Sequence, residues 1–330
     1  MSNKSISVVI PNFNGKHLLS QNLPSVISAL KNSGTNYEII LIDDCSKDDS
    51  VAFIEQNYPN IRLIRSLQNE GFSVSCNKGI RVANCDLTFL LNTDIQLPVD
   101  YFESQFQYFD VPDTFGVMAK VIGLKNRDVQ DTARYLSRSG FKIKANNFFY
   151  TKNEDFWCPT VYLSGANALI DTEKLKAIGG FDEIFSPFYC EDFDMGLRVW
   201  RLGWKCYYQP KTYCLHDHSA TTKNSGTREW VKSIFFRNRL IVHSIHLQGV
   251  ERRLWIMQLL LTDFLFRWIS GRYFFYKSLN MFFKMSERIA QSRKNFDRLM
   301  ENNGSCKSLQ DIRKMMNEML QDQTIVKGRN

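Results

Sequence analysis

The sequence predicts an α/β fold in which helices flank a mostly parallel sheet. In the first hundred residues, short apolar runs alternate with amphipathic helical patterns, which is typical of βαβ units. The run at residues 87–91 is apolar at almost every position, as expected of a parallel strand that is buried on both faces. Three of the runs end in polar residues, which indicates a ligand crevice at one edge of the sheet.

The elements follow each other in a regular order in the first part of the chain. Strands are expected at residues 5–10, 37–42, 61–64 and 87–91, with helices at residues 17–31, 48–56 and 73–83. Residues 100–160 show no regular period. Later we expect strand character at residues 161–171, a helix at 191–202, a strand at 204–215 and helices from residue 230 onward.

The overall composition limits the class of protein. A chain of 330 residues can bury one large core, with or without an appendage. Residues 1–7 are polar and lead directly into the first strand, so we expect no signal peptide. The eight cysteines are scattered without the spacing of a metal site, so we expect free thiols and a reducing, cytoplasmic location.

Asp94 follows the apolar strand at residues 87–91. Open α/β sheets bind ligands outside the carboxyl ends of their strands, which is where this carboxylate is expected. An anionic ligand would be repelled by Asp94 unless a hard cation lay between them, so the position suggests a metal-bridged phosphate. The alternative is that Asp94 only begins the turn before Pro98.

Two other groups stand where a strand ends or a helix begins. Asp43 and Asp44 follow the strand at residues 37–42 and could accept hydrogen bonds from a nucleobase or a ribose. Capping of the next helix is the alternative. Gly71 precedes the helix at residues 73–83, where a glycine lets a ligand approach the helix N-terminus, although a plain turn explains it equally well.

Glu191 and Asp192 open the helix at residues 191–202 beside aromatic residues. A carboxylate at such a helix mouth can act as a general base that takes a proton from a hydroxyl group. Acidic residues in a first helical turn also interact favourably with the helix dipole, which is the structural alternative. His216 follows a strand that could return the chain to the same crevice, and a histidine among acids is a candidate metal ligand.

Six short motifs occur in an order that resembles a known enzyme family. They are residues 8–15 (VVIPNFNG), 41–46 (LIDDCS), 69–72 (NEGF), 90–94 (LLNTD), 179–183 (GGFDE) and 191–192 (ED). Together they resemble glycosyltransferase family 2, the inverting enzymes with a GT-A fold, and its rhamnosyltransferase and galactofuranosyltransferase-like branch. The resemblance implies a catalytic domain at residues 1–245, followed by a helical extension at residues 246–330.

The resemblance also implies which residues bind the donor and the metal. The donor nucleotide would be bound by Pro11, Asn12, Asn14, Asp43, Asp44, Gly71, Phe72, Asn77, Lys78 and Asn92. Asp94 would be the metal-binding acid of the DxD-type motif, and His216 would complete the metal site. Many relatives carry Asp at the position of Asn92, so this chain keeps a single carboxylate there.

For the reaction itself, the resemblance implies Asp192 as the catalytic base, with Glu191 as its alternative, and places Gly165 and Ala166 under the sugar and the acceptor. These residue types suit single displacement with inversion. Mg²⁺ or Mn²⁺ would neutralise the leaving nucleoside diphosphate, and one carboxylate on the opposite face would deprotonate the acceptor hydroxyl.

The implied substrates are a UDP- or dTDP-linked sugar and a glycan or a polyprenyl-diphosphate-linked acceptor of bacterial O-antigen or capsule synthesis. One alternative is a sugar nucleotidyltransferase, which would need a Gly-rich phosphate loop that residues 11–16 do not supply. Another is a catalytically inactive membrane scaffold, which the presence of Asp94, Asp192 and His216 disfavours.

The second part of the chain is basic. Residues 1–197 carry a net charge of −6 and residues 198–330 a net charge of +14. Aromatic residues such as Trp255, Trp268 and Phe283 alternate there with Lys and Arg, which suits helices that lie on the anionic inner surface of the plasma membrane. Packing on the catalytic domain or in a homodimer is the alternative.

Two classes of function are disfavoured for this basic part. In its aromatic stretch at residues 254–283 the longest uncharged run has nine residues, whereas a bilayer-spanning helix needs roughly 20 apolar residues. No nucleic-acid recognition motif is visible, so a nucleic-acid partner is not expected. The last stretch of about 25 residues is polar and is expected to fray.

Overall fold

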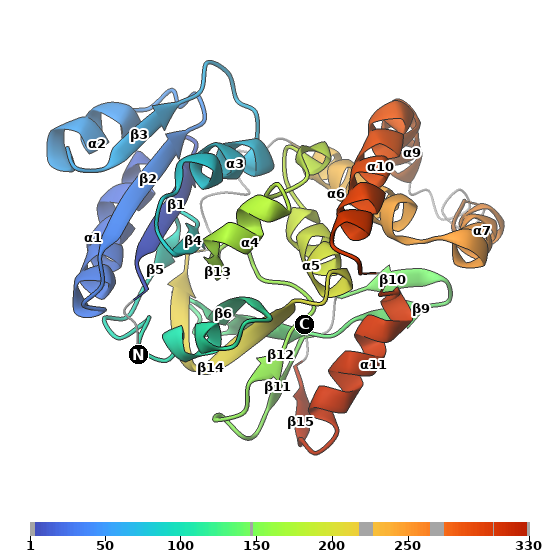
Figure 1. The fold of residues 1–330 in the computed structure, drawn as a ribbon. Coiled ribbons are helices and arrows are strands. Elements are labelled where there is room, and N and C mark those ends of the chain that lie inside the picture. Colours follow the sequence, from blue (N-terminus) through green and yellow to red (C-terminus); the bar gives the residue numbers. More distant parts are fainter. Residues whose placement is uncertain (1–3, 146–147, 218–226, 265–273, 306, 329–330) are drawn as a thin grey trace.

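The computed structural model describes residues 4–145, 148–217, 227–264, 274–305 and 307–328. Its strands are β1 (Ile6–Asn12), β2 (Tyr37–Asp43), β3 (Arg62–Arg65), β4 (Leu87–Leu91), β5 (Ile95–Gln96), β6 (Thr114–Gly123), β7 (Val129–Asp131), β8 (Ala133–Arg134), β9 (Ser137–Ser139), β10 (Lys142–Lys144), β11 (Phe148–Thr151), β12 (Cys158–Pro159), β13 (Asn167–Asp171), β14 (Lys205–His216) and β15 (Ile325–Lys327). Ten of them form the central sheet, with eight in the order β12-β14-β6-β13-β4-β1-β2-β3, while β5 pairs with β14 and β7 with β6 (Figure 1).

The helices cover both faces of this sheet and one end of the molecule. They are α1 (Lys16–Asn32), α2 (Ser50–Asn57), α3 (Phe72–Val82), α4 (Thr172–Ala177), α5 (Glu191–Arg201), α6 (Arg228–His246), α7 (Gly249–Gln258), α9 (Phe274–Phe283), α10 (Ser286–Asn302) and α11 (Leu309–Leu320). Short 3₁₀ turns are η1 (Phe106–Asp110) and η2 (Glu183–Phe185), and η3 (Leu259–Phe264) is a π-helical turn.

β1 lies between β2 and β4 and runs parallel to both. This pairing places Asn12, the last residue of β1, directly beside Asp43, the last residue of β2. β4 ends at Leu91 on the other side of β1, and the loop that carries Asp94 follows. The expected α/β fold with converging polar strand ends is therefore confirmed. The sheet is mixed rather than wholly parallel, because β13 runs antiparallel between β4 and β6.

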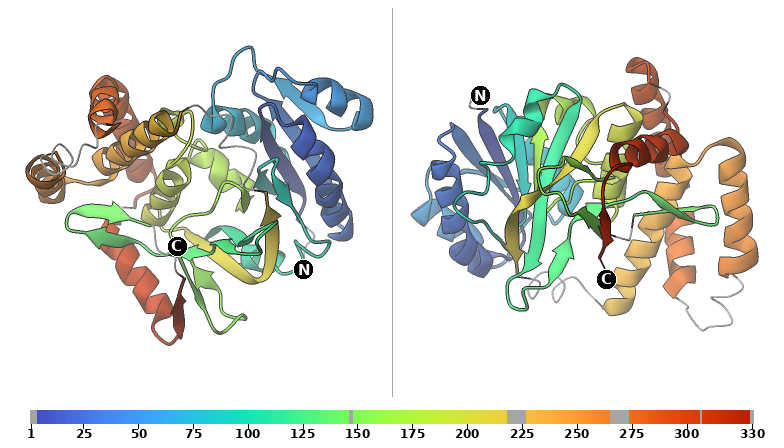
Figure 2. Two further views of the ribbon diagram at one scale, coloured as in Figure 1. Left: turned by 180° about the vertical axis from the view of Figure 1, so that it is seen from behind. Right: turned by 90° about the horizontal axis from the view of Figure 1, so that it is seen from below.

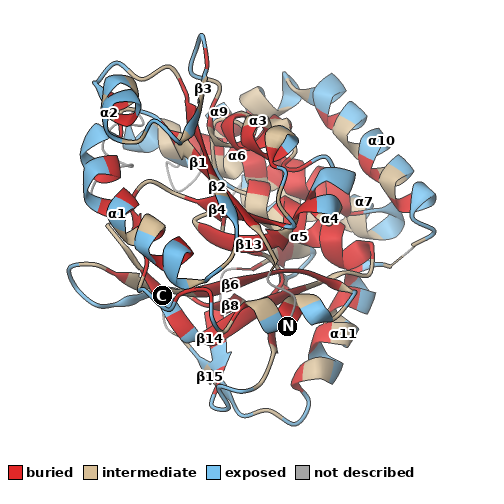
Figure 3. Ribbon diagram, turned by 60° about the vertical axis from the view of Figure 1, so that its left-hand side comes forward, coloured by how far each residue is buried: buried red, intermediate tan, exposed pale blue. Residues whose placement is uncertain are grey.

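Alternate residues of the strands feed two hydrophobic cores on opposite faces of the sheet. Val8 and Ile10 of β1 pack with Leu19 and Leu23 of α1. Val9, between them, points to the other face, where α3, α4, α5 and α6 contribute buried residues. Figure 3 shows buried residues along the strands and on the helix faces turned toward them. The apolar strands are thus buried on both faces, as parallel strands usually are.

One central strand was not expected from the sequence. β6 lies within residues 100–160 and pairs antiparallel with β13 and parallel with β14. Eight of its ten residues are buried, so its side chains show no alternation that a period of two could reveal. Conversely, the strand expected at residues 161–171 begins only at Asn167, because residues 165 and 166 form a turn.

The last helix and strand belong to the main fold. Ser308 and Asp311 exchange hydrogen bonds in a capping box at the start of α11. The buried face of this helix includes Ile312 and Met316, which share a core with α5 and α6. β15 pairs with β11. The expectation that the last residues fray is therefore wrong for residues 307–328, because apolar side chains at helical spacing give them a buried face.

Figure 2 shows α6, α7, α9 and α10 at the end of the molecule away from α1 and α2. The predicted domain boundary at residue 245 falls at the end of α6. Within the described ranges, no helix is both long and apolar enough to cross a bilayer. The seven cysteines in the described residues are free thiols. Trp268 and Cys306, which entered the sequence predictions, lie outside the described residues.

Truncation of Ile312 tests whether α11 is part of the folding unit. Ile312 is fully buried, so Ile312→Ala is expected to lower the free energy of unfolding by about 2–5 kcal/mol. Lys314→Ala, on the exposed side of the same helix, should change it by no more than about 0.5 kcal/mol. Urea denaturation of the full chain measures both values. Equal stability of the two variants would mean that α11 is not packed as described.

Candidate active site

The polar ends of β1 and β2 are locked together by side-chain hydrogen bonds. Asn12 Nδ2 donates to Asp43 Oδ1 at 3.0 Å and to Ser46 Oγ at 3.2 Å. The other oxygen of Asp43 accepts from the backbone N–H of Ser46 at 3.0 Å. Asn14, in the left-handed region with φ of 52°, accepts from the Lys47 N–H. These contacts fix the loops after β1 and β2, and Pro11 precedes them as a half-buried residue of β1.

Asp44 holds a different loop from its neighbour Asp43. Its carboxylate accepts from the backbone N–H of Glu70 at 3.0 Å and of Gly71 at 2.8 Å. The sequence left open which aspartate faces the donor, and the structure gives them separate partners. Asp43 braces the β1–β2 side of the crevice, and Asp44 braces the loop that enters α3.

Gly71 permits the closest backbone approach at this edge. Its φ is +89°, and a Cβ atom there would lie 2.7 Å from Pro187 Cα. The next residue, Phe72, donates its N–H to the Pro187 carbonyl at 2.9 Å, and its ring lies against Gly165, where a Cβ atom would be 2.9 Å from the ring. The structure therefore brings Gly71 and Phe72, expected near the donor, next to Gly165, expected under the sugar.

Asn77 and Lys78 support this region and are engaged with the protein. Both amide hydrogens of Asn77 are used, because Nδ2 donates to the Phe181 carbonyl at 2.9 Å and to Glu183 Oε1 at 3.0 Å. These bonds tie Asn77 to the loop at residues 180–183, and its expected contact with the nucleotide stays a prediction. Lys78 forms an ion pair with Glu70 and donates to Ser66 Oγ.

Asp94 and His216 meet at the carboxyl end of the sheet. Asp94 is buried, and its Oδ2 lies 3.3 Å from Nε2 of His216, which ends β14. The backbone of Asp94 also accepts from the Asp217 N–H at 3.0 Å. Asn92 and Ala166 lie nearby, since the Asn92 N–H donates to the Ala166 carbonyl at 3.3 Å.

Gln130 of β7 contacts His216 on the side of the ring away from Asp94. Its Oε1 lies 2.6 Å from His216 Nδ1, so Nδ1 donates to it, and in the neutral ring Nε2 is the nitrogen with the lone pair. A lone pair and a carboxylate oxygen attract each other only through a proton or a cation. Metal-binding histidines usually donate their other ring N–H to an acceptor such as this one, so Asp94 and His216 fit a divalent cation.

These two residues supply only part of a metal coordination sphere. Across the described residues, no group of three His, Cys, Asp or Glu side chains could hold an ion. Mg²⁺ is typically bound through one or two carboxylates together with waters and substrate phosphates. The site therefore suits a metal that is shared with a phosphate ligand. The sequence alone gave no signal for Gln130, which lies in an irregular stretch.

Glu191 and Asp192 form the first turn of α5 and differ in environment. Burial raises the pKa of Asp192 to about 6, and the charge of Asp131 adds to this effect, while the Phe193 N–H and Arg134 oppose it. Burial, together with the charge of Asp192, raises the pKa of Glu191 well above its ordinary value. Asp192 is therefore mostly ionised at neutral pH, whereas the neutral form of Glu191 is favoured.

The turn before Glu191 is held in an unusual backbone conformation. Tyr189 and Cys190 have φ angles of 77° and 73°, in the left-handed region that is costly for side chains of this size. Asn238 of α6 lies opposite, fully buried, and donates to the carbonyls of Phe185, Phe188 and Tyr189 at 2.7–2.9 Å. This contact sets the direction in which α5 begins, and the sequence did not reveal it.

A second buried network holds the body of α5. Arg198 donates to Asp194 at 2.8 Å and to the carbonyls of Ile178 and Gly180. His246 at the end of α6 lies 2.9 Å from the other oxygen of Asp194. The positive charge of Arg198 and the hydrogen bond from His246 outweigh burial and lower the pKa of Asp194. Asp194 is thus a structural acid, unlike its neighbours Glu191 and Asp192.

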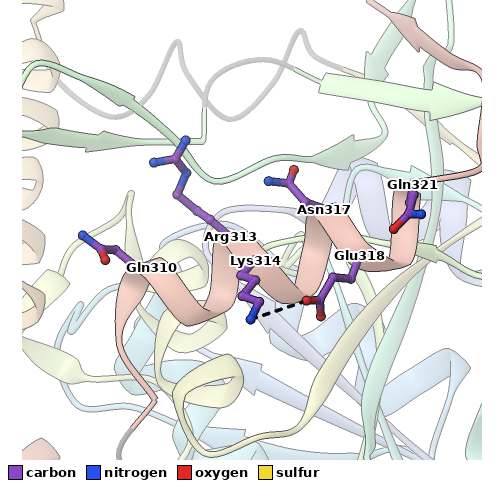
Figure 4. A pocket seen from close by; sticks show the side chains of 6 residues that line it. All are labelled: Gln310, Arg313, Lys314, Asn317, Glu318 and Gln321. Carbon is purple, nitrogen blue, oxygen red and sulfur yellow. Dashed lines mark ion pairs between the residues drawn. The ribbon is translucent and has the colours of Figure 1, made fainter.

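A cavity of about 200 Å³ opens beside Asp192. It is lined by Ile143, Lys144, Ala145, Tyr162, Tyr189, Cys190, Asp192, Phe193, Phe235, Arg239, Val242 and His243. A larger hollow of about 480 Å³ lies along α11, where flexible polar side chains such as Arg313 and Asn317 surround it (Figure 4). None of the candidate site residues lines that hollow. Of the two cavities, the one beside Asp192 therefore contains a candidate catalytic residue.

Comparison with known proteins identifies the family of the chain. The family model of Glycosyl transferase family 2 matches residues 7–179, just over half of the chain. N-acetylglucosaminyl-diphospho-decaprenol L-rhamnosyltransferase of Mycobacterium tuberculosis is 24% identical over 208 residues, which cover 56% of this chain and 67% of that protein. O-antigen chain rhamnosyltransferase RfbN of Salmonella typhimurium is 25% identical over 244 residues, which cover 70% of this chain and 72% of that protein.

Among solved structures, that of GalNAc-T7 with UDP, GalNAc and Mn²⁺ superimposes with a TM-score of 0.61. The match covers 96% of this chain but only 56% of that one, at 16% sequence identity. At this level of identity the likeness is one of fold. It extends over both the parallel half of the sheet and the helices that follow it.

Proposed function

This chain belongs to glycosyltransferase family 2, and we propose that it transfers one sugar from a UDP- or dTDP-linked donor, with inversion, to a glycan or lipid-linked hydroxyl. The names of its relatives support this choice, because they include a rhamnosyltransferase that acts on a diphospho-decaprenol-linked sugar and an O-antigen rhamnosyltransferase. Synthesis of a bacterial surface polysaccharide, at the cytoplasmic face of the membrane, is the setting that these names favour.

The donor nucleotide would lie across the loops that follow β1 and β2. Asn12, Asn14 and Asp43 would line its base and ribose, with their side chains pre-ordered by the hydrogen bonds among the loops. Gly71 and Phe72 would pack against it from the α3 side. Asp44 would contribute indirectly, because its carboxylate is bound to the backbone of this loop.

Asp94 and His216 would hold Mg²⁺ or Mn²⁺ together with the donor diphosphate. When bound, the ion would neutralise the negative charge that develops on the leaving diphosphate. Gln130 would keep the Nε2 lone pair of His216 directed at the ion. Asn92, lacking a charge, would leave the site dependent on the diphosphate for further oxygen ligands.

Asp192 would be the base that deprotonates the acceptor hydroxyl, and its pKa is the observation that carries the proposal. A pKa of about 6 leaves the carboxylate ionised at neutral pH but still basic enough to take a proton. Glu191 suits this role less, since burial favours its neutral form. After transfer, the proton would leave Asp192 to solvent through the open side of the cavity.

The end of the molecule formed by α7 and η3 would contact the membrane that carries the acceptor. Leu260 and Leu261 are 59% and 68% exposed, and Met257 and Phe264 lie exposed near them. Arg252 and Arg253 on α7 add positive charge. Exposed apolar side chains beside basic ones suit an anionic bilayer surface. A homodimer through the same face is the competing interpretation.

The metal role of Asp94 can be tested without measuring turnover. Calorimetry with UDP is expected to give at least tenfold tighter binding with Mn²⁺ than with EDTA, because the ion would bridge Asp94 and the diphosphate. Asp94→Asn should remove most of this difference. Asp100→Asn, an exposed aspartate in the following loop, should retain it. Equal UDP binding with Mn²⁺ and EDTA in the native protein would contradict the metal site.

The role of Asp192 predicts both a loss of rate and a pH dependence. Asp192→Asn should lower kcat by about 10²–10⁴-fold while UDP affinity stays within twofold, because only the base is removed. In the native enzyme, kcat/KM should fall tenfold per pH unit below about pH 6, as Asp192 becomes protonated. Glu191→Gln is the comparison: if it abolishes transfer and Asp192→Asn does not, Glu191 is the base.

Membrane contact can be tested at the exposed leucines. The double substitution Leu260→Glu and Leu261→Glu should abolish sedimentation with vesicles that contain anionic phospholipid, because it replaces apolar contacts with like charges. Leu67→Glu alters an almost fully exposed leucine elsewhere on the surface and should not change binding. Unchanged vesicle binding, with conversion of a dimer to a monomer in light scattering, would favour the dimer interpretation.

A further inference from the structure

The cavity at Asp192 contains a cation that the reaction described so far does not use. Arg239 of α6 lines it together with Asp192, Tyr162 and Phe235. With a volume of about 200 Å³, the cavity is smaller than the roughly 300–1,000 Å³ of typical drug-sized ligand sites. Its size suits a single sugar unit, which leaves the nucleotide to the loops at the sheet edge.

The guanidinium of Arg239 has no carboxylate partner in the part of the chain that the structure describes. Its charge lies 5.7 Å from the centre of the Phe235 ring. The nearby carboxylate of Asp263 is already paired with Lys142. Burial lowers the pKa of Arg239 and the charge of Asp263 offsets this only in part, so the guanidinium is partly removed from water without full compensation. Such a cation on a cavity wall is poised to receive an anionic group.

Asp192 does not fill this role, because its own electrostatic partners lie elsewhere. The cation that lowers its pKa is Arg134, which is paired in turn with Asp131 at 2.7 Å. Arg239 and Asp192 therefore carry opposite charges on the wall of one cavity, and they do not neutralise each other. A ligand with a hydroxyl group at one end and a negative charge at the other would be oriented by them.

The position of Arg239 is fixed by a histidine that carries no charge. His243, one turn further along α6, accepts at Nε2 from the Ile143 N–H at 3.1 Å, and its Nδ1 donates to the Arg239 carbonyl. Burial lowers the pKa of His243 to about 3, and its ring stacks on Trp255 at 5.2 Å. His243 thus joins this turn of α6 to β10 at all ordinary pH values, and the positive charge of the wall comes from Arg239 and Lys144.

We propose that Arg239 binds an anionic group on the acceptor sugar, either a phosphate on its anomeric oxygen or the carboxylate of a uronic acid. This inference rests on the proposed function, because it assigns the acceptor to the cavity that holds the base. The planar guanidinium can donate two parallel hydrogen bonds to either anion. Binding at Arg239 would present a hydroxyl on the same ring to Asp192, so the anion would select the acceptor and orient it.

Three sugars can test the proposal: glucose 1-phosphate, methyl glucuronide and methyl glucoside, since each anionic sugar differs from the neutral glucoside in one group. We expect one or both anionic sugars to bind at least tenfold more tightly than the neutral glucoside, in ligand-observed NMR titrations with UDP and Mn²⁺ present. The stronger of the two identifies the source of the anion. Arg239→Gln should bring the anionic sugars to within twofold of the glucoside, and Arg239→Lys should retain part of the preference.

Arg228→Gln is the matched control, because Arg228 is an exposed arginine at the start of the same helix and should not affect any of the three sugars. Equal affinity for charged and neutral sugars, no binding of either anionic sugar, or an unchanged preference in a folded Arg239→Gln variant would each overturn the proposal. UDP binding is recorded in the same samples and reports on the donor site separately. Loss of UDP binding alone would count against the proposed function and not against the anion site.

Discussion

The parallel pairing of β1 with both β2 and β4 is the constraint on which the rest of the site depends. It brings Asn12 beside Asp43 and places the loop of Asp94 on the other side of the same strand. Since strand interiors are buried on both faces, polar groups can appear only where the strands end. The crevice is thus a consequence of strand direction, and the hydrogen bonds among its loops fix side chains that the sheet has already brought together.

The acidic residues of this region show how environment separates identical groups. Asp194 is paired with Arg198 and hydrogen-bonded to His246, so its pKa is lowered and its role is structural. Asp192, two residues earlier, is partly buried with weaker compensation, and its pKa rises to about 6. The charged form of Asp192 is kept close to its neutral form in free energy, which is the condition for moving protons near neutral pH. Helix α5 sets the spacing of Asp192 and Asp194, and the groups around each acid determine whether its pKa is raised or lowered.

The sequence revealed the features that are local in the chain. The strands at the start follow from apolar runs, and Asp94 and Asp192 could be found because motifs surround them. It did not reveal β6, whose two buried faces leave no periodic pattern, nor Gln130 and Asn238, which act on residues far away in the chain. It likewise did not reveal the hydrogen bond from Asn77 to the distant Phe181 carbonyl. Hydrogen bonds between residues far apart in the chain leave no pattern in the sequence, so this part of the site could be found only in the structure.

The hydrogen bond from His216 to Gln130 bears directly on how a metal would enter. With Nδ1 donating to Gln130, Nε2 is the nitrogen that would bind the ion. Asp94 alone supplies negative charge, because Asn92 replaces a second acid. One carboxylate and one imidazole bind Mg²⁺ weakly compared with a site of several carboxylates, so the diphosphate must provide much of the binding. Metal and donor binding should then be mutually dependent, each raising the affinity for the other by the same factor.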